Sequence, residues 1–305
     1  MRAAATALAI GALLLPVRAQ ENSGSTFKVD VKLVNVYVTV TDQLGAPIGA
    51  LTKNDFSLSE DGVPQKISIF SKESQLPISI VLAVDTSSST RKDIRLELEA
   101  ARKFIHSIIR PQDAVSFYAF ATDVREMVSF TSKLHQIDSA INQVQVGGAT
   151  SLYDAIYLGS KALMKREGRK VLVLITDGGD TASTVDYREA LRAAQQSEAL
   201  VYSLIDVPVE ASAGRNTGGE HALIQISHDT GGKYYYASNV VELDKAFEQI
   251  SDELRTQYLL AYYPVQRRAA SDFRQIDVTA HPNRSDVNGQ LVVRARRGYY
   301  TSKLE

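Results

Sequence analysis

The sequence predicts an α/β fold whose doubly wound, mostly parallel sheet has helices on both faces and is inserted in a β-sandwich formed by the N- and C-terminal flanks. Residues 78–84 and 171–175 are almost wholly apolar, which is typical of strands buried on both faces of a parallel sheet. Helical patterns alternate with such strands, as at 94–108, where one apolar stripe recurs at helical spacing. β patterns precede and follow this part, and domain termini often lie close together, so we expect the two flanks to pair.

The flanking strands are predicted from alternation and turn signals. Apolar valines alternate with polar residues over 34–40, and another strand is expected at 66–70 after the Asp61-Gly62 turn. Changes in pattern predict an N-terminal β segment at 20–75, the α/β domain at 76–256, and a C-terminal β segment at 257–305 that pairs with 27–74. Separate β appendages are the alternative arrangement.

The remaining elements follow from hydrophobic periodicity in chain order. We expect strands at 114–121, 170–176, 200–205, 233–236, 258–263, 273–280 and 291–295, and helices at 134–144, 151–164, 187–197, 221–228 and over a last segment that ends near Leu254.

Composition excludes several classes of protein. The 305 residues are 44% hydrophobic and 23% charged, which is typical of a chain that buries a core. The 34 Lys and Arg residues nearly balance 35 Asp and Glu residues, and no polybasic run indicates nucleic acid or an anionic membrane as a partner. The chain has no Cys, which excludes disulfides, zinc–thiolate sites and thiol catalysis. Any metal would be bound by oxygen or imidazole ligands.

Residues 1–19 have the pattern of a secretory signal peptide. Arg2 is followed by an apolar run at 3–15, and Ala19 places a small residue at the expected cleavage point. The run is shorter than the roughly 20 residues that span a bilayer. We therefore expect a cleaved signal peptide, no stable membrane span, and a secreted or periplasmic protein. Export without Cys favours a bacterial source.

Polar side chains are expected at one edge of the predicted sheet. Asp85, Ser87 and Ser89 follow the first apolar strand, Asp177 follows the second, and Thr150 comes after Gly147-Gly148. Ligands of doubly wound sheets bind at the carboxyl ends of the strands, so these side chains are predicted to converge there. Carboxylates and hydroxyls suit a hard cation, Mg²⁺ above all, although Ca²⁺ or Mn²⁺ could substitute.

Each motif alone has a simpler interpretation. Ser87 to Ser89 can cap the following helix, and Thr150 and Asp177 can serve in turns. The three motifs occur together, each at the end of a strand or the start of a helix, and this combination favours the metal site. With about two carboxylates and otherwise neutral hydroxyls, a bound dication would keep positive character and could accept a carboxylate from another molecule.

In this order, the motifs Asp85-x-Ser87-x-Ser89, Gly148-Ala149-Thr150 and Thr176-Asp177-Gly178 resemble the metal-ion-dependent adhesion site of the von Willebrand factor A (VWA) domain family. The resemblance covers roughly 76–254 and includes the Thr-Gly-Gly-Lys-Tyr-Tyr segment at 230–235. It implies a doubly wound fold, Mg²⁺ held by Asp85, Ser87, Ser89, Thr150 and Asp177, and binding to proteins or matrix. None of these five positions departs from the family motif. With its signal peptide and β flanks, the chain is most similar to exported VWA-related proteins of acidobacteria.

The predicted function is that of an exported, divalent-metal-dependent binding module that captures an Asp or Glu side chain of a protein partner. A scaffold of an envelope assembly with a vestigial metal site is the first alternative, and a metal-dependent hydrolase is the second. No His is near the three motifs in sequence and Gly-x-Ser-x-Gly is absent, so we do not expect an enzyme. The sequence does not indicate an oligomeric state.

Other charged residues are assigned simpler roles. Asp123, Asp154 and Asp180 lie near the motifs but are expected to be solvated surface carboxylates rather than ligands. Arg294, Arg296 and Arg297 are expected to form a charged strand edge that discourages aggregation.

Overall fold

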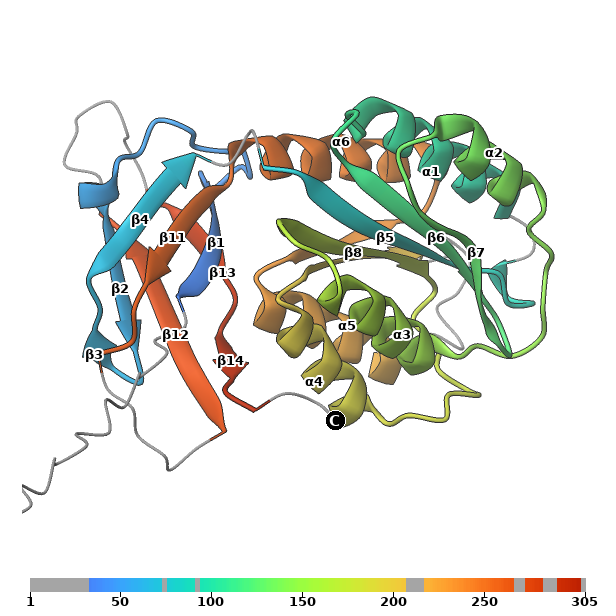
Figure 1. The fold of residues 1–305 in the computed structure, drawn as a ribbon. Helices are drawn as coiled ribbons and strands as arrows, with labels where there is room; N and C mark the ends of the chain where they lie inside the picture. Colours follow the sequence, from blue (N-terminus) through green and yellow to red (C-terminus); the bar gives the residue numbers. More distant parts are fainter. Residues whose placement is uncertain are drawn as a thin grey trace, which may run out of the picture. The chain divides into compact units, whose positions relative to one another are not determined.

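The computed structural model describes residues 33–72, 76–90, 94–206, 217–265, 272–281 and 290–302, which all belong to the compact unit Lys32–Glu305. The predicted signal peptide lies outside the described residues. Figure 1 shows a central sheet with helices on its two faces and further strands from both flanks of the chain.

The central sheet has six strands in the order β10-β9-β8-β5-β6-β7. Every neighbouring pair is parallel except β6 and β7, which are antiparallel. All eight residues of β5 are buried, as expected for a strand with helices on both faces. The sheet confirms the predicted doubly wound α/β fold, and its strands are β5 (Ile78–Asp85), β6 (Ala114–Phe120), β7 (Val124–Thr131), β8 (Arg169–Thr176), β9 (Leu200–Asp206) and β10 (Lys233–Ala237).

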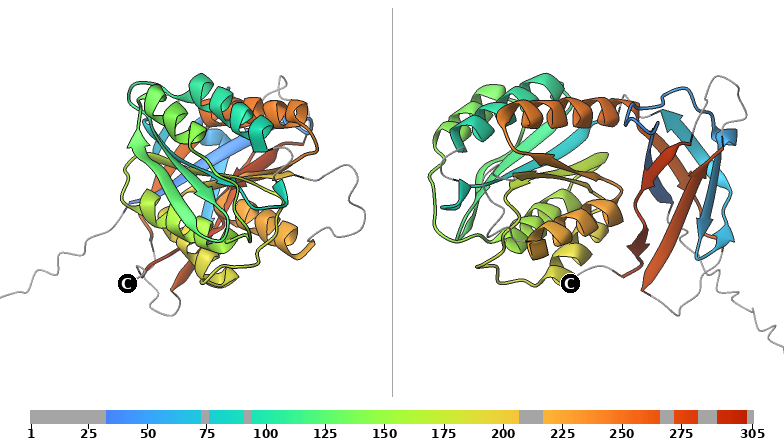
Figure 2. Two further views of the ribbon diagram at one scale, coloured as in Figure 1. Left: turned by 90° about the vertical axis from the view of Figure 1, so that its right-hand side faces the viewer. Right: turned by 180° about the vertical axis from the view of Figure 1, so that it is seen from behind.

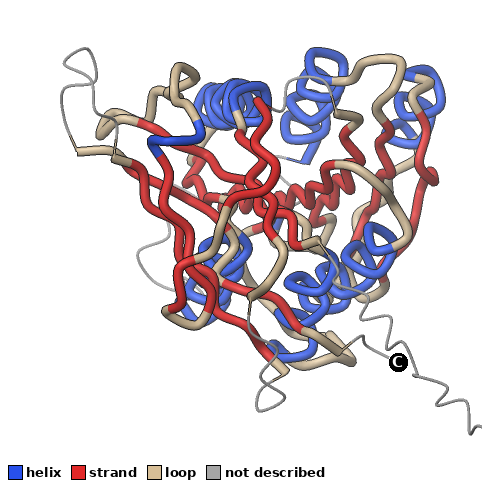
Figure 3. Tube along the Cα trace, turned by 60° about the vertical axis from the view of Figure 1, so that its left-hand side comes forward, coloured by secondary structure: helices blue, strands red, loops and turns tan. Residues whose placement is uncertain are grey.

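Helices cover the central sheet in two layers, as Figures 1 and 3 show. On one face, α1 (Ile94–Ile108), α2 (Leu134–Asn142) and α6 (Val240–Thr256) share a hydrophobic core with the strands. On the other face, α3 (Leu152–Met164), α4 (Tyr187–Ser197) and α5 (Thr217–Thr230) form a second core. The apolar stripe predicted for 94–108 is the buried side of α1, where Phe104 stacks on Phe247 of α6 with ring centroids 4.5 Å apart.

The two flanks pair with each other in two four-stranded sheets, ordered β13-β1-β11-β4 and β14-β12-β2-β3. In both sheets N-terminal strands lie beside C-terminal ones, which Figure 2 shows as blue strands next to orange and red ones. This is the pairing that the predicted insertion in a β-sandwich requires. The strands are β1 (Val34–Thr41), β2 (Phe56–Glu60), β3 (Val63–Pro64), β4 (Ile67–Lys72), β11 (Tyr258–Tyr262), β12 (Phe273–Ala280), β13 (Val292–Ala295) and β14 (Gly298–Tyr300), and a short 3-10 helix, η1 (Lys53–Asp55), precedes β2.

A third core lies within the sandwich. The alternating valines of β1 are buried, and Tyr258 and Tyr262 of β11 point into the same cluster. The Tyr258 hydroxyl donates to the carbonyl oxygen of Ile48 at 2.6 Å, and the Tyr262 hydroxyl donates to Glu60 at 2.6 Å. Buried tyrosine hydroxyls need such partners, so these contacts fix the register of strands that are distant in the sequence.

Strand β7 was not predicted from the sequence. None of its residues is buried, and its pairing with β6 is interrupted by two register shifts. Because β7 is the edge of the sheet, only one of its sides forms a ladder, and its sequence carries a weaker apolar signal than the buried strands. The structure therefore adds one antiparallel strand at the edge beside β6.

Candidate functional site

The five predicted ligands lie around the point where the strand order reverses. The chain continues from β5 to β6 on one side of the sheet and from β8 to β9 on the other, so the crevice lies between the carboxyl ends of β5 and β8. Asp85 is the last residue of β5, and Thr176 is the last residue of the neighbouring parallel strand β8. The fold thus delivers two of the three motifs to adjacent positions.

Asp85 is completely buried, at 0% exposure. One carboxylate oxygen accepts the backbone N–H of Ser87 at 2.9 Å, and the other accepts the hydroxyl of Thr176 at 2.7 Å. Burial raises the pKa of Asp85 to about 6, and the nearby negative charge of Asp177 adds to this rise, while the hydrogen bonds from Ser87 and Thr176 oppose it. The group is therefore held in place by neutral donors, next to a second carboxylate.

The two serines of the Asp-x-Ser-x-Ser turn face each other. The Ser87 and Ser89 hydroxyl oxygens are 2.9 Å apart, although Ser87 is buried and Ser89 is exposed. The hydroxyl of Thr90 donates to the carbonyl oxygens of Asp85 and Ser87, which stabilises the turn. The spacing of two residues therefore brings both hydroxyls to one place, as the motif predicted.

The loop that carries Thr150 is hydrogen-bonded directly to this turn. The N–H of Gly147 donates to the carbonyl oxygen of Thr86 at 2.7 Å, and the N–H of Ser88 donates to that of Gly148 at 3.0 Å. A side chain at Gly147 would place its Cβ 2.3 Å from the Cβ of Ala121, so only glycine permits this close approach. Two of the three predicted motifs are in direct contact.

Thr150 and Asp177 are the other two predicted ligands. Thr150 is buried, and its N–H donates to the hydroxyl of Thr181 at 2.9 Å. Asp177 directly follows β8, and its carboxylate accepts the N–H of Gly179 at 3.2 Å. Gly178 takes a φ of +86°, so the turn after Asp177 favours glycine at position 178. Asp177 is near enough to Asp85 for its charge to affect the pKa of Asp85.

The chemistry of this donor set fits a hard divalent cation. All donors are oxygens, two are carboxylates, and within the described ranges no Lys, Arg or His side chain forms an ion pair with either Asp85 or Asp177. A buried carboxylate without a cation is costly, and a bound Mg²⁺ would remove that cost. The set relies on hydroxyls, because the described part of the chain holds no group of three or more His, Cys, Asp or Glu side chains suited to a metal.

Comparison with protein families decides what kind of domain this is. The family model for the von Willebrand factor type A domain matches residues 79–249, more than half of the 305-residue chain. The chain belongs to the von Willebrand factor type A domain family. The matched residues run from β5 into α6, so they include the three loop motifs and leave out every strand of the sandwich.

Two solved structures share this fold at low identity, and a third is reported as a weaker similarity. A von Willebrand factor type A protein from Catenulispora acidiphila has a TM-score of 0.52 and 11% identity, covering 75% of this chain and 71% of that one. Proximal thread matrix protein 1 from the mussel byssus has a TM-score of 0.51 and 16% identity, covering 64% of this chain and 49% of that one. The PilB minor pilin from Streptococcus sanguinis has a TM-score of 0.48 and 14% identity. The match covers 60% of this chain, and this chain spans 62% of the length of the pilin. A comparison with curated proteins gives no match.

Asp154 and Asp180, two carboxylates near the three motifs, have structural roles that their positions in the sequence do not indicate. Asp154 accepts the backbone N–H groups of Thr184 and Val185 at 3.0 and 2.9 Å. Asp180 accepts the N–H of Tyr153 at 3.2 Å. Both were expected to be solvated; instead, they fasten the loop after β8 to the start of α3, because short acidic side chains readily satisfy exposed backbone donors. Thr176 and Thr181 also support the site, and their roles depend on contacts between distant segments that no local pattern indicates.

Two of the three arginines at 294–297 form ion pairs with the VWA domain rather than a charged strand edge. Arg294 of β13 forms an ion pair with Glu253 of α6 at 2.6 Å, and Arg296 forms one with Glu198 at 3.3 Å. The expectation that these residues serve mainly to discourage aggregation is therefore wrong for Arg294 and Arg296, because their partners come from the VWA domain.

Across the described residues, no helix of the VWA domain or sandwich has the length and apolar character to cross a membrane.

Proposed function

We propose that this VWA domain is an exported binding module that holds Mg²⁺ with Asp85, Ser87, Ser89, Thr150 and Asp177 and uses it to capture an acidic side chain of a protein partner. The observation that carries the proposal is the environment of Asp85, which is fully buried with neutral hydrogen-bond donors and a second carboxylate nearby. Family membership supports a protein-interaction role. Export is supported by the signal-peptide pattern of residues 1–19.

Each ligand has a defined task in this proposal. Asp85 and Asp177 supply negative charge, and the hydroxyls of Ser87, Ser89 and Thr150 supply neutral oxygen donors. Hydroxyl ligands leave more positive charge on a dication than carboxylates would, so the bound Mg²⁺ would supply an attractive coordination position for an external carboxylate. Thr176 and the N–H of Ser87 orient Asp85, and the Gly147–Thr86 hydrogen bond holds the two loops together.

The hydroxyls of the motif are better arranged for binding than for nucleophilic catalysis. An activated serine needs a general base within hydrogen-bond reach. The Ser87 hydroxyl contacts the hydroxyl of Ser89 and the carboxylate of Asp85, which this proposal assigns to the cation rather than to proton transfer. The proposal is therefore that of a binding protein and not of a hydrolase.

Calorimetric titration of Mg²⁺ into the purified protein tests the site directly. We expect one binding event per chain and its loss in Asp85→Asn. The matched control is Asp113→Asn, because Asp113 is also buried and also accepts backbone N–H groups, those of Ile78 and Arg110, but at the opposite edge of the sheet. Mg²⁺ affinity should stay within about twofold of wild type in this control, since distant sites are nearly independent. Binding that survives Asp85→Asn, or no binding by the wild type, contradicts the proposal.

Partner capture distinguishes this function from its alternatives. A Glu-containing peptide should bind in Mg²⁺ and dissociate in EDTA. Envelope partners that are retained equally well in EDTA would favour a scaffold with a vestigial site. Metal-dependent hydrolysis of an ester, phosphoester or peptide that is lost in Ser87→Ala would favour the enzyme.

A further inference from the structure

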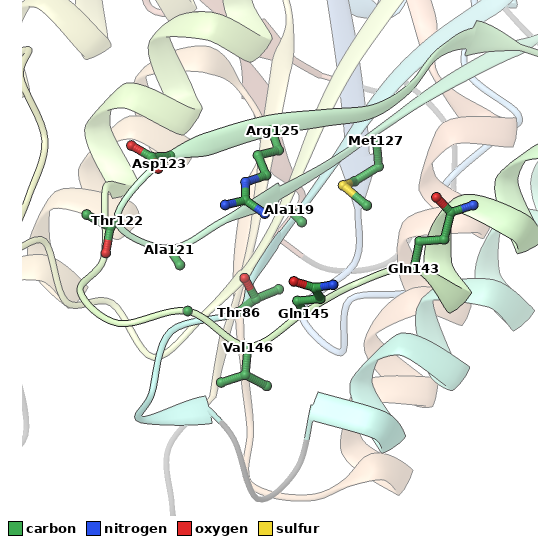
Figure 4. A pocket seen from close by; sticks show the side chains of 11 residues that line it. Thr86, Ala119, Ala121, Thr122, Asp123, Arg125, Met127, Gln143, Gln145 and Val146 are labelled. Carbon is green, nitrogen blue, oxygen red and sulfur yellow. The ribbon is translucent and has the colours of Figure 1, made fainter.

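A polar pocket adjoins the candidate metal site. It has a volume of about 210 Å³ and lies between the end of β6, the start of β7 and the loop before α3. That space accommodates a carboxylate group together with several waters. We call it the Arg125 pocket, and the lining side chains that matter here are Thr86, Thr122, Asp123, Arg125, Gln143 and Gln145 (Figure 4).

The pocket and the metal site share two stretches of chain. Thr86, which lines the pocket, is covalently bonded to Asp85, which belongs to the metal site. Gly147, on the same wall of the pocket, is three residues before Thr150. The hydrogen bond from Gly147 to the carbonyl oxygen of Thr86 holds these stretches side by side. A ligand group in the pocket would therefore be a close neighbour of one held at the metal.

Arg125 gives the pocket its chemical character. The residue is exposed on the edge strand β7, and its neighbour across the ladder is Ala119, which is small and uncharged. Within the described ranges the guanidinium has neither an ion pair nor a hydrogen bond. Figure 4 shows the side chain extending from β7 into the pocket, toward the wall that carries Thr86 and Gln145. Arginine in this situation can bind a carboxylate through two parallel hydrogen bonds.

The other lining groups suit the same ligand. Thr86, Thr122, Gln143 and Gln145 bring hydroxyl and amide groups, which can donate to an anion. Asp123 is the one acidic side chain in the lining, and Figure 4 shows it on the opposite side of the Arg125 side chain from Gln143. The place for an anion is therefore next to Arg125 and the two glutamines.

We propose that the Arg125 pocket is a second anion subsite, which binds a carboxylate two or three residues away from the one captured at the metal, so that the domain selects partners with paired acidic side chains. This inference rests on the proposed function for its first carboxylate only. Residues two or three positions apart in an extended chain are separated by roughly 7–10 Å, a span that suits two adjoining subsites. A single acidic side chain would fill only one of them.

Synthetic peptides test the subsite. The probes are capped Gly/Ser peptides that carry one Glu, two Glu at i and i+2, or two Glu at i and i+3, titrated by calorimetry in Mg²⁺. We expect a two-Glu peptide to bind wild type about tenfold more tightly than the one-Glu peptide, as one added charge-assisted contact allows. Arg125→Gln should remove this gain, keep the affinity for the one-Glu peptide, and keep the affinity for Mg²⁺ alone.

The matched control is Arg188→Gln, which removes the same charge from an exposed position on α4. It should retain the tenfold preference, since only the local guanidinium matters in this proposal. Equal losses in Arg125→Gln and Arg188→Gln would overturn the subsite and indicate general electrostatic attraction. An unchanged preference in Arg125→Gln would overturn it as well.

A metal-free titration separates failure of the subsite from failure of the metal site. In EDTA, nuclear magnetic resonance should show the two-Glu peptide shifting the side-chain signals of Arg125, Gln143 and Gln145, because the guanidinium does not need the cation. Such shifts without Mg²⁺ binding by the wild type would support the subsite and reject the proposed metal function. Normal Mg²⁺ binding without these shifts, and without the Arg125-dependent preference, would reject the subsite alone.

Discussion

Asp85 and Glu253 are both buried carboxylates, at 0% and 1% exposure, but their surroundings differ. Glu253 of α6 lies 2.6 Å from Arg294 and 3.6 Å from Lys233, and it also accepts the hydroxyls of Tyr202 and Tyr235. The environment of Asp85 offers a hydroxyl, a backbone N–H and the charge of a second carboxylate.

The difference separates a carboxylate that the chain itself neutralises from one for which we propose an external cation. The chain itself provides the positive charges around Glu253, and they come from the central sheet and the sandwich, so the cluster joins α6 to both. Burial raises the pKa of the Tyr202 hydroxyl well above its usual value, which keeps it a neutral donor to Glu253. At Asp85 no such charges are present among the described residues, so the electrostatic cost of burial is not offset by a positive side chain.

Removing the charge of Glu253 is expected to have the largest effect. Glu253→Gln leaves Arg294 and Lys233 without their buried partner, which should lower the free energy of unfolding by about 3–5 kcal/mol. Urea unfolding measures this loss, which should be the same in Mg²⁺ and in EDTA. The control is Asp244→Asn on the same helix, which breaks an exposed pair with Lys103 and should cost at most about 1 kcal/mol. Equal losses in the two variants would contradict the structural role of Glu253.

Asp85→Asn should have the opposite effect on the metal-free protein. Removing an uncompensated buried charge should raise the free energy of unfolding in EDTA at pH 7, by about 1–3 kcal/mol. The Thr176 hydroxyl can turn to accept from the new amide, so its hydrogen bond need not be lost. The same variant should lose the stabilisation that Mg²⁺ gives to wild type in thermal unfolding. A loss of stability in EDTA as large as that of Glu253→Gln would remove the distinction between the two regions.

The stability of the metal-free protein should depend on pH through Asp85. Burial raises the pKa of Asp85 to about 6 in the folded state from 3.8, so the folded protein binds this proton more tightly than the unfolded chain. The contribution of Asp85 to stability therefore falls as the pH rises from about 4 to about 6 and stays low above that window. The difference in free energy of unfolding between Asp85→Asn and wild type in EDTA should grow over this range. A difference that is flat or falls with pH would contradict the buried, uncompensated state of Asp85.

The smallest predicted effect distinguishes two neighbouring serines. Ser89→Ala removes a proposed ligand and should weaken Mg²⁺ binding by about tenfold or more. This size is expected because changes in the groups that support metal ligands cost about 10–100-fold at other sites. Ser88→Ala is the matched control, because Ser88 is exposed and its hydroxyl donates to Gly148 at 3.2 Å outside the proposed ligand set. Calorimetry should show little change in Ser88→Ala. Equal losses would indicate that the turn, and not the Ser89 hydroxyl, controls affinity.

Prediction from sequence was accurate where the signal is local and strong. The helix at 187–197 and the strand at 273–280 have the predicted bounds, because periodicity and turn signals are concentrated within them. The edge strand β7 was missed because it packs on one side and carries two register shifts. Arg294 was misinterpreted because its partner, Glu253, is on a helix whose packing against the sandwich leaves no local pattern.

The sequence by itself determined the α/β pattern, most of the flanking strands and the three loop motifs with their oxygen donors. These features depend on residue type and short-range spacing, which fix backbone conformation and side-chain chemistry within a few residues. Only the tertiary structure decided that Thr176 orients Asp85, that Arg294 neutralises Glu253, and that Arg125 extends into a pocket beside the proposed metal site. Contacts of this kind join segments from separate strands and helices, and their energies depend on burial and on neighbouring charges, which arise only when the chain is packed.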